Sequence, residues 1–161
     1  MVSSGTRGCK AARVTNESEP VLQLWRALGK RDWDAVKTLV SDDCIFLDMP
    51  LGPRLAARGP DAIVKRLRSG LENENLANWE NRDVLLLTNG VDVMYEHLVT
   101  YSSTNGEIAN NPIVSVHKVG DGKVSLWKDY WDFNTIANTT WFQSSLAGGD
   151  MSWVFDASGL V

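Results

Sequence analysis

Apolar and polar residues alternate through much of the second half of the chain. Successive side chains of a strand point to opposite faces, so this alternation predicts four strands, at 83–87, 91–102, 108–119 and 124–133. Asn89-Gly90, Asn105-Gly106 and the Gly-Asp-Gly segment at 120–122 predict tight turns between them, so the strands form a meander. Pro112 has no backbone N–H, which places the start of the third strand at an edge or a bulge.

Apolar residues of the first half recur at helical spacing instead. Four of them predict a first helix after Pro20: Val21, Leu24, Trp25 and Leu28. Asp32 predicts the N-cap of a second helix over 33–39. A third helix is expected from Ala62 to about Leu71, and its basic residues are expected on the solvated face: Lys65, Arg66 and Arg68.

Between the second and third helices, Cys44 to Met49 reads as a short strand that is apolar on both faces. Residues 50–60 hold three of the five prolines and are expected to form a loop. Residues 76–81 fit neither pattern, and the segment after Phe133 is expected to be irregular. The order helix, helix, strand, helix and four strands predicts an α+β domain, with helices closing the concave face of a curved sheet around a cavity.

Composition narrows the class of protein. A chain of 161 residues suggests one domain, expected at 17–161 with a core at 21–133, a Trp-rich segment at 134–161 and a disordered arm at 1–16. The net charge of -4 and the absence of a basic stripe argue against a nucleic-acid partner. No apolar run is long enough for a membrane span, and the first residues lack the apolar core of a secretory signal.

The two cysteines, Cys9 and Cys44, lie in a polar tail and an apolar run, so no disulfide framework is expected and a cytoplasmic location fits. Seven tryptophans suit either a large apolar pocket or an oligomer interface. The aromatic residues after Phe133 are expected to pack over the pocket mouth or over a partner subunit.

The strand at 124–133 carries the first candidate for chemistry. Trp127, Asp129 and Trp131 share one of its faces. A carboxylate between two indoles is poorly solvated, which raises its pKa and suits it to proton transfer near neutral pH. The alternative is that Asp129 faces water and the tryptophans belong to the edge of the core.

Two further ionisable residues are expected to face the same cavity. Asp48 shares a face with Cys44 and Phe46 and needs a partner in apolar surroundings, unless it only caps the following loop. His97 shares a face with Tyr101, and the alternative for it is a core histidine bonded to the backbone or to Glu96. His117, near a strand end, is expected at the surface or the rim.

The expected lining of the cavity is mostly aromatic: Phe46, Tyr101, Asn111, Trp127 and Trp131. Tyr101 could donate a hydrogen bond to a substrate oxygen, and its alternative is to be cavity wall only. Two histidines far apart give no spacing typical of a metal site, and no phosphate-binding glycine loop or dinucleotide motif occurs. We therefore expect a site without a cofactor.

Several motifs resemble those of one superfamily. They are Asp48-Met49-Pro50-Leu51, Gly59-Pro60-Asp61-Ala62, Glu96-His97, Gly122-Lys123-Val124 and the run from Trp127 to Asp132. Over 21–133 the chain resembles the cone-shaped fold of nuclear transport factor 2 (NTF2-like). The closest resemblance is to the group of limonene-1,2-epoxide hydrolases and SnoaL-like polyketide cyclases. The resemblance implies a homodimer, while the superfamily also contains isomerases, dehydratases and non-catalytic members.

The resemblance to the epoxide hydrolases also assigns positions. Asp129 matches the carboxylate that activates water, while Phe46 and Asp48 stand where that family has a water-binding tyrosine and asparagine. His97 stands where it has an arginine bridging two aspartates, and Val99 where it has the aspartate that protonates the epoxide. Only Asp129 is intact, which weakens the case for plain epoxide hydration.

Three functions follow for testing. The first is a general acid/base isomerase, dehydratase or cyclase acting on a small apolar, oxygenated ring compound such as a terpenoid, steroid or polyketide, with Asp129 as base and His97 and Asp48 as relay or acid. The second is an epoxide hydrolase with a rearranged site, which would place oxygen from labelled water in the product. The third is a binding or dimerisation module without catalysis.

Overall fold

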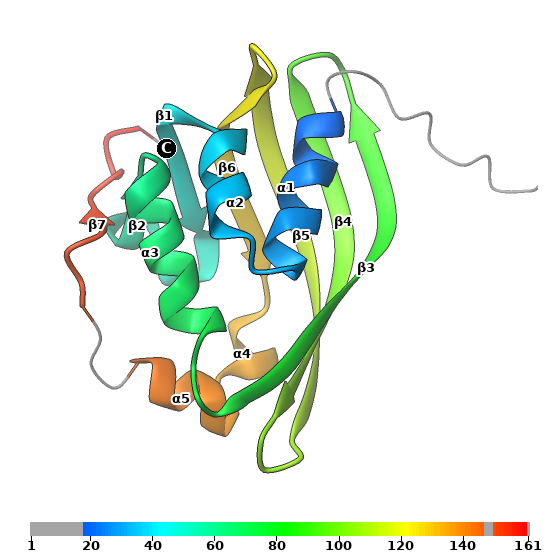
Figure 1. Ribbon diagram of the computed structural model, residues 1–161, viewed down its shortest axis with the longest axis vertical. Coiled ribbons are helices and arrows are strands. Elements are labelled where there is room, and N and C mark those ends of the chain that lie inside the picture. Colours follow the sequence, from blue (N-terminus) through cyan, green and yellow to red (C-terminus); the bar gives the residue numbers. More distant parts are fainter. Residues whose placement is uncertain (1–17, 147–149, 161) are drawn as a thin grey trace, which may run out of the picture.

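A single curved sheet with helices on its concave side forms the molecule, as Figure 1 shows. The computed structural model describes residues 18–146 and 150–160. The expected arm at 1–16, with Cys9, lies outside the described residues. The α+β class and the curved sheet predicted from the sequence are confirmed.

The helices on the concave side lie where the sequence indicated, although the first begins at Glu19 and the third begins at Pro60, two residues before the expected Ala62. They are α1 (Glu19–Gly29), α2 (Trp33–Leu39) and α3 (Pro60–Leu71). The carboxylate of Asp32 caps α2 by accepting a hydrogen bond of 3.1 Å from the backbone N–H of Ala35, as predicted. Val21, Leu24 and Val36 are fully buried against the sheet, so these helices form the roof over its concave face.

Seven strands form the sheet: β1 (Val40–Asp48), β2 (Ala56–Arg58), β3 (Leu76–Thr88), β4 (Asp92–Ser103), β5 (Ile108–Gly120), β6 (Lys123–Trp131) and β7 (Val154–Phe155). Their spatial order is β3-β4-β5-β6-β1-β2-β7. The meander from β3 to β6 is antiparallel, as predicted, whereas β1 lies parallel to β6. This parallel pair places Asp48 directly beside Asp129.

Turn and breaker residues act where they were expected. Asp121 and Gly122 have φ angles of 51° and 73°, which the tight turn between β5 and β6 requires. Pro112 lies one residue before Ile113, the first residue of β5 that pairs with β6. The start of β5 therefore has only one neighbouring strand, and Pro112 costs the sheet no hydrogen bond on the open side.

Two expectations about local structure were wrong, and one segment that fitted neither pattern forms a strand. The expected loop at 50–60 contains two short 3-10 helices, η1 (Met49–Leu51) and η2 (Pro53–Leu55), and also β2, which pairs with β1. Residues 76–81 begin the long strand β3. The segment after Phe133 is not irregular throughout, because it forms α4 (Phe133–Ile136), α5 (Thr140–Leu146) and β7.

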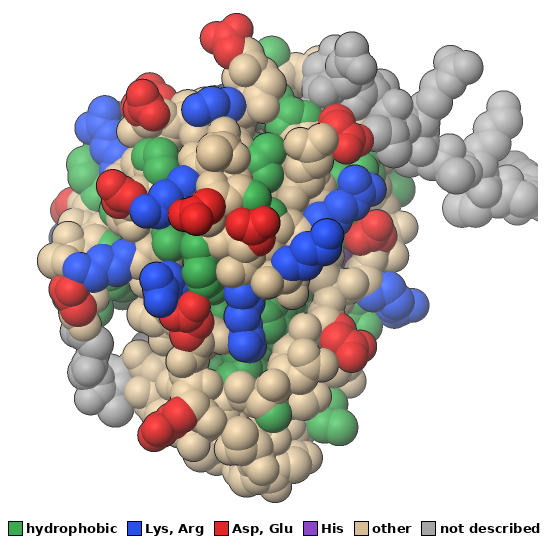
Figure 2. Space-filling view, in the orientation of Figure 1, with side chains coloured by type: hydrophobic (Ala, Val, Ile, Leu, Met, Phe, Trp, Pro, Cys, Tyr) green, Lys and Arg blue, Asp and Glu red, His purple; other side chains and the backbone are tan. Residues whose placement is uncertain are grey.

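Charged side chains are interspersed over the helical face seen in Figure 2, and no histidine is visible on it. Both histidines are in fact buried. The opposite face of the sheet carries apolar residues that no helix buries. Met94 and Tyr130 are nearly half exposed there, and each lies across from a valine of β5.

Candidate active site

The concave side of the sheet encloses a cavity of about 200 Å³. Its wall combines residues of the sheet, the helices and the C-terminal segment, of which Trp141, Phe142 and Trp153 line it. Three of the four C-terminal aromatic residues therefore border the cavity, one of the two expected positions, whereas Phe155 packs against Arg58. Most of the lining is apolar, and its charged groups are few: Asp48, Arg66, Asp129 and Asp150.

Asp129 is buried in this wall, with 5% of its surface exposed. Its Oδ1 accepts a hydrogen bond of 2.6 Å from the indole N–H of Trp127 and is hydrogen-bonded to Ser115 Oγ at 2.5 Å. Burial, and next to it the charge of Asp48, raise the pKa of Asp129 to about 8, although hydrogen bonding and the charge of Arg66 oppose the rise. The structure thus agrees with the expected inward-facing carboxyl group of raised pKa.

Asp48 lies beside Asp129 but in different surroundings. Its Oδ2 accepts a hydrogen bond of 2.6 Å from Arg66 Nη2, and its Oδ1 accepts one of 3.1 Å from the indole N–H of Trp131. The guanidinium of Arg66 also stacks over the ring of Trp153, at 5.3 Å from its centroid. One acid is therefore held by a cation and its neighbour by neutral donors only.

Arg66 corrects the sequence-based expectation for α3. It was placed on the solvated face, yet its side chain is only 17% exposed and reaches Asp48 inside the cavity. The alternative that Asp48 caps the following loop is also wrong, because its side chain makes no capping hydrogen bond. The buried carboxylate instead has the partner that burial of a charge requires.

His97 was expected to face the cavity together with the two acids, and it does not line it. Its ring is buried beneath Trp25 of α1, with ring centroids 4.2 Å apart. It lies behind Ser115, since His97 Nε2 is 3.0 Å from Ser115 Oγ and its Nδ1 is 2.6 Å from Asn81 Oδ1. Burial lowers the pKa of His97 to about 4, although the charge of Asp83 opposes this.

His117 was expected at the surface or the rim, which was wrong. It is fully buried near Trp127 and does not line the cavity. Burial lowers its pKa to about 3. Both histidines are therefore neutral at physiological pH, and only His97 is linked to the cavity through hydrogen bonds.

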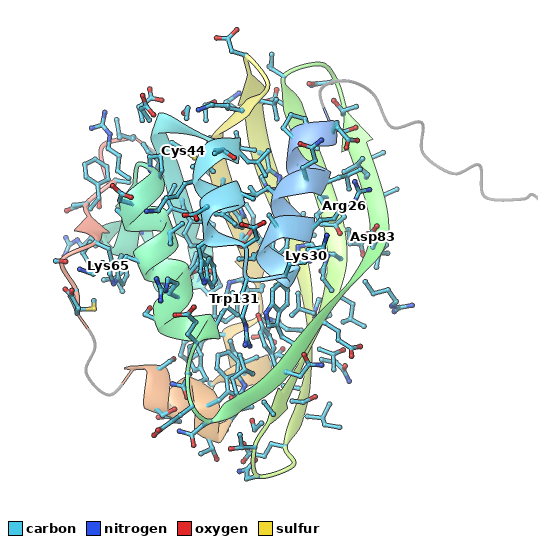
Figure 3. The ribbon with its side chains drawn as sticks, viewed as in Figure 1. Arg26, Lys30, Cys44, Lys65, Asp83 and Trp131 are labelled. Atoms are coloured by element: carbon cyan, nitrogen blue, oxygen red, sulfur yellow. The ribbon has the colours of Figure 1, made fainter. Side chains whose placement is uncertain are left out.

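All five expected lining residues do border the cavity: Phe46, Tyr101, Asn111, Trp127 and Trp131. Figure 3 shows Trp131 in the interior of the molecule. Burial, followed by the charges of Asp48 and Asp129, raises the pKa of the Tyr101 phenol. Tyr101 is thus a hydroxyl group that keeps its proton and donates hydrogen bonds.

Several polar atoms in the lining have no partner among residues 18–146 and 150–160. They are the indole N–H groups of Trp25, Trp79 and Trp141, and the Oδ1 atom of Asn111. Buried polar groups normally find hydrogen-bond partners. In this part of the chain, residues that line the cavity therefore hold three buried donors and one buried acceptor without a partner.

Sequence reasoning missed four contributors to this region: Arg66, Trp79, Ser115 and Asn81. Ser115 shares the inward parity of Ile113 on β5, which was the available signal for it. In the described part of the chain, no three residues of the metal-ligating types His, Cys, Asp and Glu cluster as a metal site would require. None of the helices in that part combines the length and apolarity needed to cross a bilayer.

Comparison with known proteins gives a family. The family model of the SnoaL-like domain matches residues 21–127. No curated protein matches the chain. Among solved structures, a limonene-epoxide-hydrolase-like (LEH-like) epoxide hydrolase of M. tuberculosis is similar, with a TM-score of 0.63 and 21% identity over 83% of this chain and 91% of that one.

Two further structures are similar at comparable levels. A protein assigned as a SnoaL-like polyketide cyclase from Shewanella putrefaciens has a TM-score of 0.66 and 17% identity over 78% of this chain and 96% of that one. TerC, co-crystallised with polyporic acid, has a TM-score of 0.65 and 18% identity over 83% of this chain and 100% of that one. At such identities the likeness shows the fold, and it confirms the NTF2-like cone.

Proposed function

The chain belongs to the SnoaL-like domain family, and on that basis we propose that it is a cofactor-free general acid/base enzyme. Its substrate is a small, largely apolar, oxygenated ring compound of the terpenoid, steroid or polyketide kind. The observation that carries the proposal is Asp129, a buried carboxyl group whose pKa is raised to about 8 inside a cavity of ligand-binding character.

The two acids take different roles because their surroundings differ. Asp48 is ion-paired with Arg66, which holds its carboxylate in place next to the substrate. Asp129 has no cation in contact among the described residues, so its proton is the one that moves. In its ionised form Asp129 removes a proton from the bound ring compound, and in its protonated form it returns the proton at another position.

Donors in the same cavity hold the oxygen atom on which charge develops. Tyr101 keeps its proton because its pKa is raised, and the unpartnered indole N–H groups of Trp25, Trp79 and Trp141 point to an acceptor-bearing ligand. Fixed donors at a developing oxyanion lower the barrier for proton removal from a neighbouring carbon. Removal and return of one proton with such support is sufficient for isomerisation, elimination or ring closure.

The apolar wall supports a ring compound as substrate. It excludes water, which strengthens the charged and hydrogen-bonding groups inside. TerC was co-crystallised with polyporic acid, and this agrees with ligands of that kind for the fold. Chemistry that moves protons without water fits such a cavity better than hydration does.

The pH dependence of a probe reaction tests Asp129 as base. With 5-nitrobenzisoxazole, a carboxylate base removes the proton on C3, the N–O bond breaks, and a coloured cyanophenolate forms. Because only ionised Asp129 reacts and its pKa is about 8, we expect kcat/KM to rise about tenfold per pH unit below that value and to level off above it. A rate that is already level at pH 6 would contradict a base of raised pKa.

Two other functions are outcomes of related experiments. If cyclohexene oxide is opened with incorporation of oxygen-18 from labelled water, the protein is an epoxide hydrolase with a rearranged site. If ligands bind but no proton-transfer reaction depends on Asp129, it is a non-catalytic binding module. Epoxide hydrolysis lacks the acid that the resemblance would require, since the apolar Val99 lines the cavity at that position.

Homodimerisation belongs to the proposal as well. The face of the sheet turned away from the helices exposes Met94 and Tyr130, beside Val114 and Val116 of the neighbouring strand. An uncovered apolar sheet face is a suitable surface for a second copy. A monomeric mass in light scattering at micromolar concentration would rule out this part of the proposal.

A further inference from the structure

A continuous chain of hydrogen bonds leads from the cavity acid to the surface of the molecule. It runs through six side chains on four strands: Asp129, Ser115, His97, Asn81, Tyr95 and Asp83. The inner half joins Asp129 Oδ1 to Ser115 Oγ at 2.5 Å and Ser115 Oγ to His97 Nε2 at 3.0 Å. All three of these residues are buried.

The outer half continues from the other ring nitrogen of His97. Its Nδ1 lies 2.6 Å from Asn81 Oδ1, and Asn81 Nδ2 lies 2.8 Å from Tyr95 Oη. Tyr95 Oη is in turn hydrogen-bonded to Asp83, which is exposed on β3. Figure 3 shows Asp83 near Arg26 of α1, and both border a second cavity, of about 400 Å³, between α1 and β3.

The exposed end decides the direction in which the side chains of this series donate their hydrogen bonds. A carboxylate can only accept hydrogen bonds, and Asp83 accepts one from the hydroxyl of Tyr95. Tyr95 therefore donates to Asp83, and the single hydroxyl proton of Tyr95 is used. Its oxygen then accepts from the amide N–H of Asn81, so the amide oxygen of Asn81 faces His97.

The same assignment of donors and acceptors extends from Asn81 to Asp129, the buried end of the series. Because Asn81 Oδ1 only accepts, His97 Nδ1 carries the proton, and a neutral ring then leaves Nε2 as an acceptor. Nε2 takes the hydroxyl proton of Ser115. Ser115 has no second proton to give. Neutral Asp129 therefore donates to Ser115 Oγ, whereas donation from Ser115 to Asp129 belongs to the ionised form, which that bond favours.

We propose that Asp83, Tyr95, Asn81, His97 and Ser115 are positioning residues that hold Asp129 protonated in the resting protein, through hydrogen bonds that all donate in one direction. This deepens the proposed function, on which its catalytic meaning rests. A carboxyl group stabilised in its neutral form is a stronger base once it is ionised. Ionisation of Asp129 reverses the Ser115 hydroxyl and leaves His97 Nε2 without a donor.

Other charged or titratable groups face this chain and enter its pH dependence. Asp129 is faced by Asp48, Arg66 and Tyr101, and His97 by Asp83 and His117. Tyr95 is influenced by Arg26 and keeps its proton, because burial and the bond to Asp83 raise its pKa. The lowered pKa of His97 agrees with the neutral ring that the chain requires.

The tautomer of His97 gives a test that needs no substrate. Long-range proton–nitrogen correlation spectra of the 15N-labelled full chain distinguish the two neutral tautomers. At pH 7 we expect the proton on Nδ1 and a bare Nε2 in the wild type. In the D83N variant the amide can donate to Tyr95 Oη, so the chain can reverse and the proton is expected on Nε2.

The titration of Asp129 gives the second readout. In protein labelled with 13C at aspartate carboxyls, assigned with D129N, we expect D83N to lower the pKa of Asp129 by about one unit, since a hydrogen bond changes from favouring the neutral to favouring the ionised form. Glu80→Gln is the matched control. It removes one negative charge from the same strand and the same second cavity without touching the chain.

These outcomes separate the inference from the proposed function. An Nε2–H tautomer in the wild type, or equal shifts of the Asp129 pKa in D83N and E80Q, would overturn the directional chain even in an active enzyme. Conversely, the expected tautomer and pKa shift could be observed without any elimination of 5-nitrobenzisoxazole. That result would support the hydrogen-bond series and reject Asp129 as the catalytic base. Because Asp83 is exposed, its amide variant is expected to fold.

Discussion

Replacement of Asp129 by asparagine is expected to lower the elimination of 5-nitrobenzisoxazole by about a thousandfold, since a positioned general base contributes about 10²–10⁴ in rate. Asparagine keeps the shape of the side chain and one oxygen for the bond from Trp127. It cannot take up a proton at neutral pH. Loss of rate with unchanged binding of the probe would assign the effect to chemistry.

The same variant is expected to be more stable than the wild type. The pKa of Asp129 is about 8 in the folded chain, above the value of about 3.8 expected in the unfolded chain, so the neutral form is favoured on folding. The contribution of Asp129 to the free energy of unfolding is fully favourable below its pKa in the unfolded chain and is lost as pH rises through 8. At pH 7 this lowers the free energy of unfolding of the wild type by on the order of 4 kcal/mol. The asparagine variant avoids this loss because its side chain stays neutral.

Thermal unfolding across pH measures this difference. At about 2–4 °C per kcal/mol for a chain of this size, D129N should unfold on the order of 10–20 °C higher at pH 8 and show little gain at pH 4. Asp132→Asn is the control, because Asp132 is exposed one residue after β6 and caps α4, where asparagine caps equally well. Equal activity in both variants would remove Asp129 from the mechanism.

Replacement of Arg66 by methionine is expected to destabilise the fold by about 3 kcal/mol. The ion pair with Asp48 is largely buried, and loss of one partner leaves the other charge without compensation. Methionine keeps much of the volume over Trp153. In D48N/R66M both charges are absent, so we expect most of the stability to return, as is usual when a buried pair is replaced as a whole.

Urea unfolding of the two single variants and the double variant gives the coupling between Asp48 and Arg66. Lys65→Met is the matched control on the same helix. Lys65 pairs with Asp150 at the surface, and exposed pairs contribute little. If R66M and K65M are equally stable, the burial of the Asp48–Arg66 pair has no energetic weight and Arg66 is not what holds the Asp48 carboxylate in place.

Periodicity predicted the parts of the site that depend on which face of a strand a residue occupies. The parity of 127, 129 and 131 placed Asp129 toward the concave side, and burial there follows from the helices that the first half of the chain predicted. Turn residues fixed the pairing of β4, β5 and β6. These are local properties, so a single sequence carries them.

Arg66 shows what such reasoning misses. A helix turns about 100° per residue, so position 66 lies at the flank of the stripe formed by Ile63 and Leu67. From there a long side chain can turn toward water or toward the cavity. Arg66 turns toward the cavity because Asp48 accepts its hydrogen bond. The sequence does not give the distance between α3 and the strand that carries Asp48.

His97 shows a second limit, which is depth. Its inward parity was correct, but Trp25 of α1 covers its ring and keeps it out of the cavity. Ser115, a smaller residue of the same parity on the next strand, is the one that touches Asp129. Alternation assigns a direction to a side chain and says nothing of how many layers lie beyond it.

The parallel pairing of β1 with β6 has a consequence for how the molecule acquires its chemistry. Asp48 is synthesised before Asp129. The two become neighbours only when β6, the last strand of the meander, pairs with β1. Such long-range pairing is slow and closes after local structure has formed. The neighbouring position of the two acids therefore depends on this long-range pairing and is absent from a chain in which β1 and β6 have not yet paired.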